Sequence, residues 1–178
     1  MPGSILRAQE GPVGEALPGL TFLCLGYPEQ ALERKRQALA LASELAHPYS
    51  MAFALVCVAM LYQLRREAQA TQEQAEATIR LCTEQGFDFF RAMGFCLRGW
   101  ALFVQGQATE GIAQLRQGID AWKATGAVLY VPHQLAMLAE MVSETGQTET
   151  GLAMLAEALT TVDKSGERFW LLSLRRCG

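Results

Sequence analysis

The chain is poor in charge, and its small excess of charge is acidic. Charged residues make up 19% of the 178 residues, hydrophobic residues make up 51%, and the formal net charge is -3. A nucleic-acid-binding domain usually carries a basic patch, but no basic run here exceeds Arg65-Arg66 or Arg34-Lys35-Arg36. We interpret both runs as solvated helix faces and expect no nucleic-acid partner. The high apolar fraction also excludes a largely disordered chain, which needs low hydrophobicity and high net charge.

Long hydrophobic runs are also missing. The longest uncharged apolar run, from Ala52 to Tyr62, is too short to cross a bilayer, which takes about 20 residues. The N-terminus lacks a basic region followed by an apolar stretch, so we expect no signal peptide. The sequence therefore predicts a soluble, cytoplasmic protein with no membrane partner.

Residues suited to metal binding are few and badly spaced for it. The sequence contains five cysteines, which are Cys24, Cys57, Cys82, Cys96 and Cys177. None forms a C-x-x-C pair, the spacing typical of zinc and redox sites, and most stand in apolar stretches. We expect them to be small buried hydrophobes in a reducing compartment. His47 should cap a helix or lie on the surface, and His133 lacks the three partners that zinc requires.

No group of residues predicts catalysis. Gly94 and Gly99 have the glycine spacing of a phosphate-binding loop, but Trp100 follows instead of Lys-Ser/Thr. Ser143 and Glu144 are adjacent, so on a helix their side chains would point in different directions. A nucleophile needs a base aimed at it and a third group that orients the base. We expect no enzyme, no cofactor and no metal.

What the sequence does contain is an internal repeat of 40 residues. The motif Gly-Gln-x-x-x-Gly begins at Gly106 and again at Gly146, and corresponding segments begin at Arg66 and Gly26. A second marker has the same period in a different phase, at Ala46, Gly86, Gly126 and Gly166. Glycine just after an apolar periodic segment is the usual left-handed cap at the C-terminus of a helix. The first marker predicts the turn inside a helix pair, and the second predicts the end of that pair.

Between the markers the apolar spacing is helical. Ile112, Leu115, Ile119 and Trp122 form one stripe, which Leu152, Leu155, Leu159 and Val162 repeat. We name the first helix of each pair A and the second B. The spacing predicts a B helix at about 28–45, A/B pairs at about 48–85, 88–125 and 128–165, and a truncated A helix from about 167. Residues 20–25 would end an earlier A helix, and the breaker-rich residues 1–19 are expected to be irregular.

Small residues recur where two helices of a pair should approach closely. They are Ala59, Gly99 and Ala139 in the A helices, and Ala31, Thr71, Gly111, Gly151, Ala38, Thr78, Gly118 and Ala158 in the B helices. This alternation with larger apolar residues resembles the tetratricopeptide (TPR) pattern, although the usual repeat has 34 residues. The resemblance implies an all-α, right-handed α-α superhelix. We expect one repeat domain over 20–178, with repeat boundaries near 26, 66, 106 and 146.

A closer resemblance is to the long-repeat C-terminal region of bacterial predicted ATPase and adenylate/guanylate cyclase proteins, whose ATPase core belongs to the signal-transduction (STAND) class. It is carried by the segments 25–32, 97–102, 111–118 and 163–170. In that family the cyclase and ATPase modules lie N-terminal to the repeats, and neither is present here. The resemblance implies a repeat fragment of a larger signalling protein, or a gene product reduced to its repeats.

The TPR resemblance also implies a binding surface, because partners of such superhelices usually bind the concave side, which the A helices line. Carried over by position, that surface comprises Met60, Gln63, Leu64, Met93, Cys96, Trp100, Phe103, His133, Glu140, Ser143 and Glu144. Trp100 and Met60 would offer an aromatic ring and a flexible thioether to a peptide. The alternative is that Trp100 packs between repeats.

Two functions fit these expectations. One is a non-catalytic scaffold that takes a protein or peptide partner in the groove. The other is a small-ligand sensor of a STAND-type regulator, for which Gln63, His133 and Glu140 are the polar candidates. We also expect the apolar C-terminal segment, with Phe169 and Trp170, to self-associate or to be covered by more of a larger chain.

Overall fold

The structure is a computed structural model that describes residues 27–165, and residues 1–26 and 166–178 lie outside the described part. In the described part there are seven α-helices and no β-strand. The helices are α3 (Pro28–Glu44), α4 (Pro48–Leu64), α5 (Ala68–Gln85), α6 (Asp88–Val104), α7 (Ala108–Ala124), α8 (Val131–Glu144) and α9 (Thr148–Ser165). The expected all-helical fold is confirmed. The irregular segment 1–19, the helix tail at 20–25 and the truncated helix after 167 fall outside the described residues.

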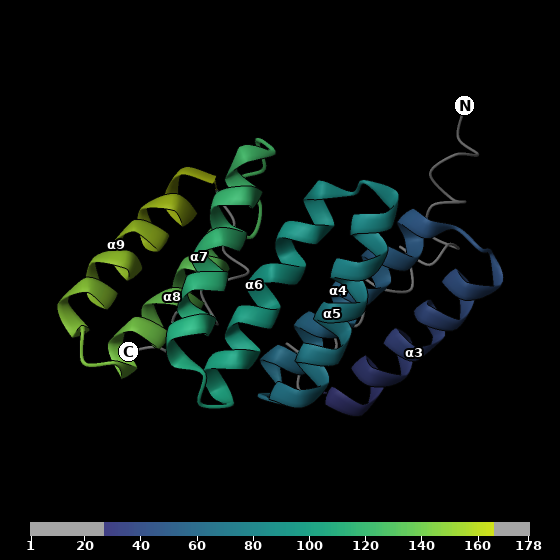
Figure 1. Cartoon of the computed structure of the whole chain (residues 1–178), viewed down its shortest axis with the longest axis horizontal. Coiled ribbons are helices and arrows are strands. Elements are labelled where there is room, and N and C mark those ends of the chain that lie inside the picture. Colours follow the sequence, from purple (N-terminus) through teal and green to yellow (C-terminus); the bar gives the residue numbers. More distant parts are fainter. Residues whose placement is uncertain (1–26, 166–178) are drawn as a thin grey trace.

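The helices follow one another in chain order along the long axis of the molecule, from α3 at one end to α9 at the other (Figure 1). Each helix packs against the next one in sequence, and α4 also packs on α6 and α6 on α8. In our terms, α4, α6 and α8 are A helices, and α3, α5, α7 and α9 are B helices. Their extent agrees with the spacing of the two sequence markers.

Backbone conformation explains why the markers end helices. Gly86 ends α5 at φ 73°, where its N–H donates to the carbonyl of Cys82. Gly106, Gly126 and Gly146 also have positive φ, a conformation that glycine adopts without a steric penalty. Ala46 and Arg66, which stand where other copies of the two markers have glycine, keep positive φ at 47° and 64°. The turn geometry is therefore retained where the glycine is lost.

Small residues set how closely the helices of a pair approach, as the sequence predicted. A Cβ added to Gly99 of α6 would lie 2.6 Å from the backbone nitrogen of Leu115 in α7. Gly118 has the same relation to α6, because a Cβ there would lie 2.6 Å from Sγ of Cys96. All the small residues named at these positions are buried. Larger side chains at these glycine positions would therefore force the paired helices apart.

Helix α8 is the main departure from the expected regularity. We expected the pair that it opens to begin near residue 128, but α8 begins at Val131, after a loop that contains Ala127 to Tyr130. Pro132 lies in the first turn of α8, which is where a residue without an N–H is tolerated. The loop is fixed to α7 by a 2.8 Å hydrogen bond from Nε1 of Trp122 to the carbonyl of Leu129. This loop becomes important for the surface described below.

Candidate binding surface

The residues expected to line a concave groove lie on the A helices, but most of their side chains are in the interior. Met60, Met93, Trp100 and His133 are at most 1% exposed, and Gln63 is 6% exposed. Phe103 and Glu140 are half-buried, and Glu144 is exposed. Trp100 was expected either to face the groove or to pack between repeats, and the structure shows it buried, packed between repeats. Binding of a partner along this face stays a prediction, and its accessible part is the end near Phe103 and Glu144.

One ion pair links the first complete helix pair to the third. Arg66, in the turn between α4 and α5, pairs through Nη2 with the Glu140 carboxylate of α8, which is 74 residues away in sequence. Glu140 occupies the same repeat position as Trp100 in α6 and Met60 in α4. The pair therefore joins the turn after α4 to α8, and α5, α6 and α7 lie between these two segments in sequence.

Two of the polar residues named for a small-ligand site lie well apart along one helix. His133 lies in the first turn of α8 and Glu140 lies seven residues further along the same helix, a separation of about 10 Å along the axis. Gln63 lies near the end of α4, and its Oε1 has no hydrogen-bond partner among the described residues. Burial lowers the pKa of His133 to about 4, so its ring is neutral at pH 7.

The other histidine and the described cysteines have the roles expected of them. His47 is the N-cap of α4, and its Nδ1 accepts a hydrogen bond from the Ser50 backbone N–H. Cys57, Cys82 and Cys96 are buried free thiols, and burial raises the pKa of each. Between residues 27 and 165, no three His, Cys, Asp or Glu side chains are grouped to hold a metal. In the same range, no helix has the length and apolar character needed to span a membrane.

Sequence reasoning missed a row of exposed apolar side chains at one edge of the molecule. Tyr49, Phe89 and Leu129 are 51%, 37% and 48% exposed, and they stand at one position of three successive repeats. We call these three residues the apolar row. Tyr49 and Phe89 are the second residues of α4 and α6, and Leu129 lies in the loop before α8. The signal was present in the sequence as a large apolar residue three positions after each second marker.

Aromatic rings hold the apolar row in place. The ring centroid of Tyr49 lies 5.0 Å from that of Phe90, and Phe90 lies 5.2 Å from Phe89. Phe89 lies 4.1 Å from Trp122, which in turn lies 5.9 Å from Tyr130. The rings form a continuous series across three helix pairs. Tyr49 and Phe89 of the row thus pack against other rings, and Phe89 lies against the buried indole of Trp122.

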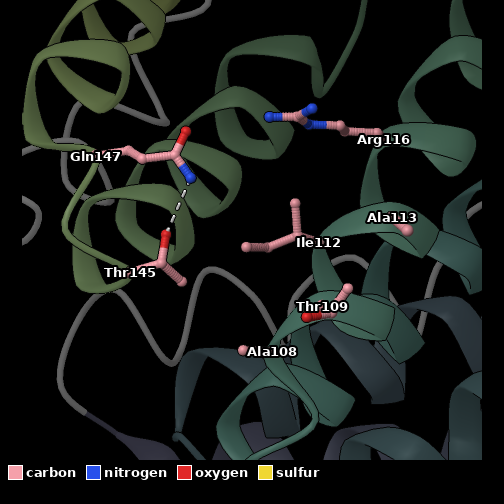
Figure 2. A pocket seen from close by; sticks show the side chains of 7 residues that line it. All are labelled: Ala108, Thr109, Ile112, Ala113, Arg116, Thr145 and Gln147. Atoms are coloured by element: carbon pink, nitrogen blue, oxygen red, sulfur yellow. Dashed lines mark hydrogen bonds between the residues drawn. The ribbon is translucent and has the colours of Figure 1, made fainter.

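An open groove of about 470 Å³ lies between α7 and the turn that joins α8 to α9 (Figure 2). Its lining residues are Ala108, Thr109, Ile112, Ala113 and Arg116 on one side, and Thr145 and Gln147 on the other. One repeat earlier, Nε2 of Gln105 donates a 2.7 Å hydrogen bond to Oε1 of Gln72. Ile112 and Thr145 occupy those two positions here and form no such bond. The groove is open to solvent, and among the described residues that line it Arg116 is the one with a charge.

Comparison with known proteins gives a distant relative. A scan against models of known protein families finds no match. Over 139 residues, 78% of the chain, the sequence is 23% identical to an uncharacterized protein of Rhizobium meliloti (strain 1021). The match covers 14% of that relative, so the chain spans a small part of the length of the curated protein that it matches.

Proposed function

We propose that this chain is a TPR-like helical-repeat scaffold that binds a protein partner and performs no catalysis of its own. The proposal includes the right-handed superhelix and an origin in the long-repeat region of a bacterial signalling protein of the ATPase/cyclase type. It is supported by the packing of successive helices, by the small residues at the pair contacts, and by the much greater length of the distant relative.

The apolar row is the observation that carries this proposal. Single exposed apolar side chains are normal on protein surfaces and need no explanation. Tyr49, Phe89 and Leu129, however, stand at the same position of three successive repeats, and all three are exposed. Val128, which precedes Leu129 in the sequence, is 67% exposed. A few residues, tyrosine prominent among them, contribute most of the binding free energy at protein interfaces. A partner segment that runs along the edge of the repeats would contact all three.

Substitution of the row tests this proposal. The purified chain is used to capture a partner from a lysate of its source organism, and the purified partner is then titrated calorimetrically. We expect Tyr49→Asp with Leu129→Asp to raise the dissociation constant at least about tenfold, because buried charge replaces apolar contact. Val104→Asp is the matched control, because Val104 is 46% exposed and lies at the opposite end of α6. Equal binding by all three proteins would contradict the proposal.

The sensor function is the second candidate, and the groove beside α7 is the observation that favours it. Arg116 would supply the charge that orients an anionic metabolite, and Ile112 an apolar contact. A metabolite that raises the melting temperature of the wild-type chain, but not of Arg116→Ala, would support the sensor. An unchanged shift in Arg116→Ala would argue against this groove as the site.

A further inference from the structure

Two carboxylates stand beside the apolar row. Glu44 is the last residue of α3, and Glu84, which is the last but one of α5, follows it by one repeat. Glu44 precedes Tyr49 and Glu84 precedes Phe89 by five residues, across the short turn that leads into the next A helix. Both glutamates are exposed. The first two repeats therefore present an apolar side chain together with a negative charge at this edge.

The position of these two carboxylates is unfavourable for the helices that carry them. The C-terminal end of a helix has a partial negative charge, which opposes an acidic side chain there. No basic residue stands in the last turn of α3 or α5. Among the described residues, neither Glu44 nor Glu84 forms an ion pair, and Arg80, one turn before Glu84, makes none with it. Side chains that oppose the local preference of the fold are expected at functional sites.

Two basic side chains at the same edge are already paired with other carboxylates. Nη2 of Arg91 lies 2.6 Å from Oδ1 of Asp88, and Nζ of Lys123 lies 3.6 Å from Oε1 of Glu157. In the third repeat, Ala124 stands where the first two repeats have glutamate. The edge is therefore acidic beside the first two members of the apolar row and apolar beside the third.

We propose that the partner of the apolar row is a basic amphipathic protein segment, whose apolar side chains contact the row and whose lysine or arginine side chains pair with Glu44 and Glu84. This inference rests on the proposed function, because it names the kind of partner that the row binds. The order of charge along the edge also sets a direction, with the basic end of the segment at α3 and its apolar end on Val128 and Leu129. The same carboxylates oppose docking on an anionic membrane, because like charges repel.

Synthetic peptides test this class of partner before the natural one is known. Three labelled peptides of about five helical turns are titrated with the full chain by fluorescence anisotropy. The first has leucine on one helical face and lysine on the other, the second has glutamate in place of lysine, and the third has serine in place of leucine. We expect the leucine/lysine peptide alone to bind, and added salt to weaken it by screening exposed charges. Equal binding of the lysine and glutamate peptides, no binding of the leucine/lysine peptide, or co-sedimentation of the chain with anionic phospholipid vesicles would overturn the proposal.

Neutral variants locate the contact. Glu44→Gln with Glu84→Gln should raise the dissociation constant of the leucine/lysine peptide about tenfold and flatten its salt dependence. Glu110→Gln with Glu149→Gln is the matched control, because it changes the net charge equally at exposed positions in the first turns of α7 and α9, at the opposite edge. Equal affinities of the two variants would overturn the proposal.

Melting temperatures separate lost binding from lost folding. Glu44→Gln with Glu84→Gln should raise the melting temperature, because it removes charge from helix C-termini, and the control should lower it slightly. A first variant less stable than the control would refute the argument from the helix ends. If Tyr49→Asp with Leu129→Asp abolishes binding of the natural partner while the two neutral glutamine positions leave it unchanged, this inference fails and the proposed function stands.

Discussion

At the scale of single residues, the ring of His133 is held in its neutral form by the protein interior. Burial lowers its pKa in the folded state to about 4, whereas an exposed histidine titrates near 6.5. Below pH 6.5 the unfolded chain therefore binds a proton that the folded chain does not, so stability falls as the pH decreases toward 4.

This linkage predicts a pH-dependent loss of stability that a neutral side chain should remove. Between pH 6.5 and pH 4, His133 should reduce the free energy of unfolding by about 3 kcal/mol relative to the His133→Gln variant. Urea titrations of both proteins at several pH values measure this difference. Parallel pH profiles for the two proteins would show that His133 is not the group responsible.

Ala46 and Gly86 hold equivalent turn positions and should respond in opposite ways to exchange. Ala46 has φ 47° and Gly86 has φ 73°, and a Cβ at Gly86 would touch nothing within 4 Å. Left-handed backbone costs an L-residue about 1 kcal/mol. Ala46→Gly should therefore stabilise the chain by up to about 1 kcal/mol, and Gly86→Ala should destabilise it by a similar amount. Urea midpoints measure both changes, and a destabilising Ala46→Gly would refute the assignment of strain.

At the scale of helices, the closest approach of α6 and α7 depends on Gly99. A methyl group there would meet backbone atoms of Leu115 and Gly111 at 2.6 and 2.8 Å. At Gly94 of the same helix, the nearest atom is the side-chain Cγ1 of Ile79 at 2.9 Å, which can move more easily. The two glycines thus differ in what surrounds them rather than in helix position.

Alanine substitution should separate these two sites. Gly99→Ala should lower the free energy of unfolding by about 2 kcal/mol, because overpacking outweighs the gain of about 1 kcal/mol in helix propensity. Gly94→Ala should cost much less, because its neighbour is a flexible side chain. Chemical denaturation followed by circular dichroism measures both. Equal effects would show that the contact between α6 and α7 tolerates a larger separation.

The boundaries of most of the described helices could be predicted because the two markers share one period and alternate along the chain. One marker stands just before each helix, and the other stands just after it. The exception was the start of α8, since Val128 and Leu129 continue the apolar pattern although they lie in a loop. Pro132 was visible in the sequence, but the hydrogen bond from Trp122 to the Leu129 carbonyl depends on the folded arrangement. Periodicity alone could not distinguish an apolar loop from the first turn of a helix.

At the scale of the whole molecule, the candidate binding surface was harder to predict than the fold. The groove residues were chosen by position in the TPR pattern, and the burial of Met60 and Trp100 depends on what packs around the A helices in space. The apolar row was accessible in principle, because Tyr49, Phe89 and Leu129 keep the repeat period. Their exposure could not be read from the sequence, since core residues keep that period as well.

Site-specific photo-crosslinking is the most direct measurement of the central claim, that the apolar row contacts a protein partner. A photoreactive phenylalanine analogue is placed in turn at Tyr49, Phe89 and Leu129, with Val104 and Glu144 as comparison positions that are also exposed. The account predicts adducts with one and the same protein at all three row positions and none at Val104. Adducts confined to Glu144 would move the interface to the A-helix groove, and the absence of adducts at the row would contradict the account.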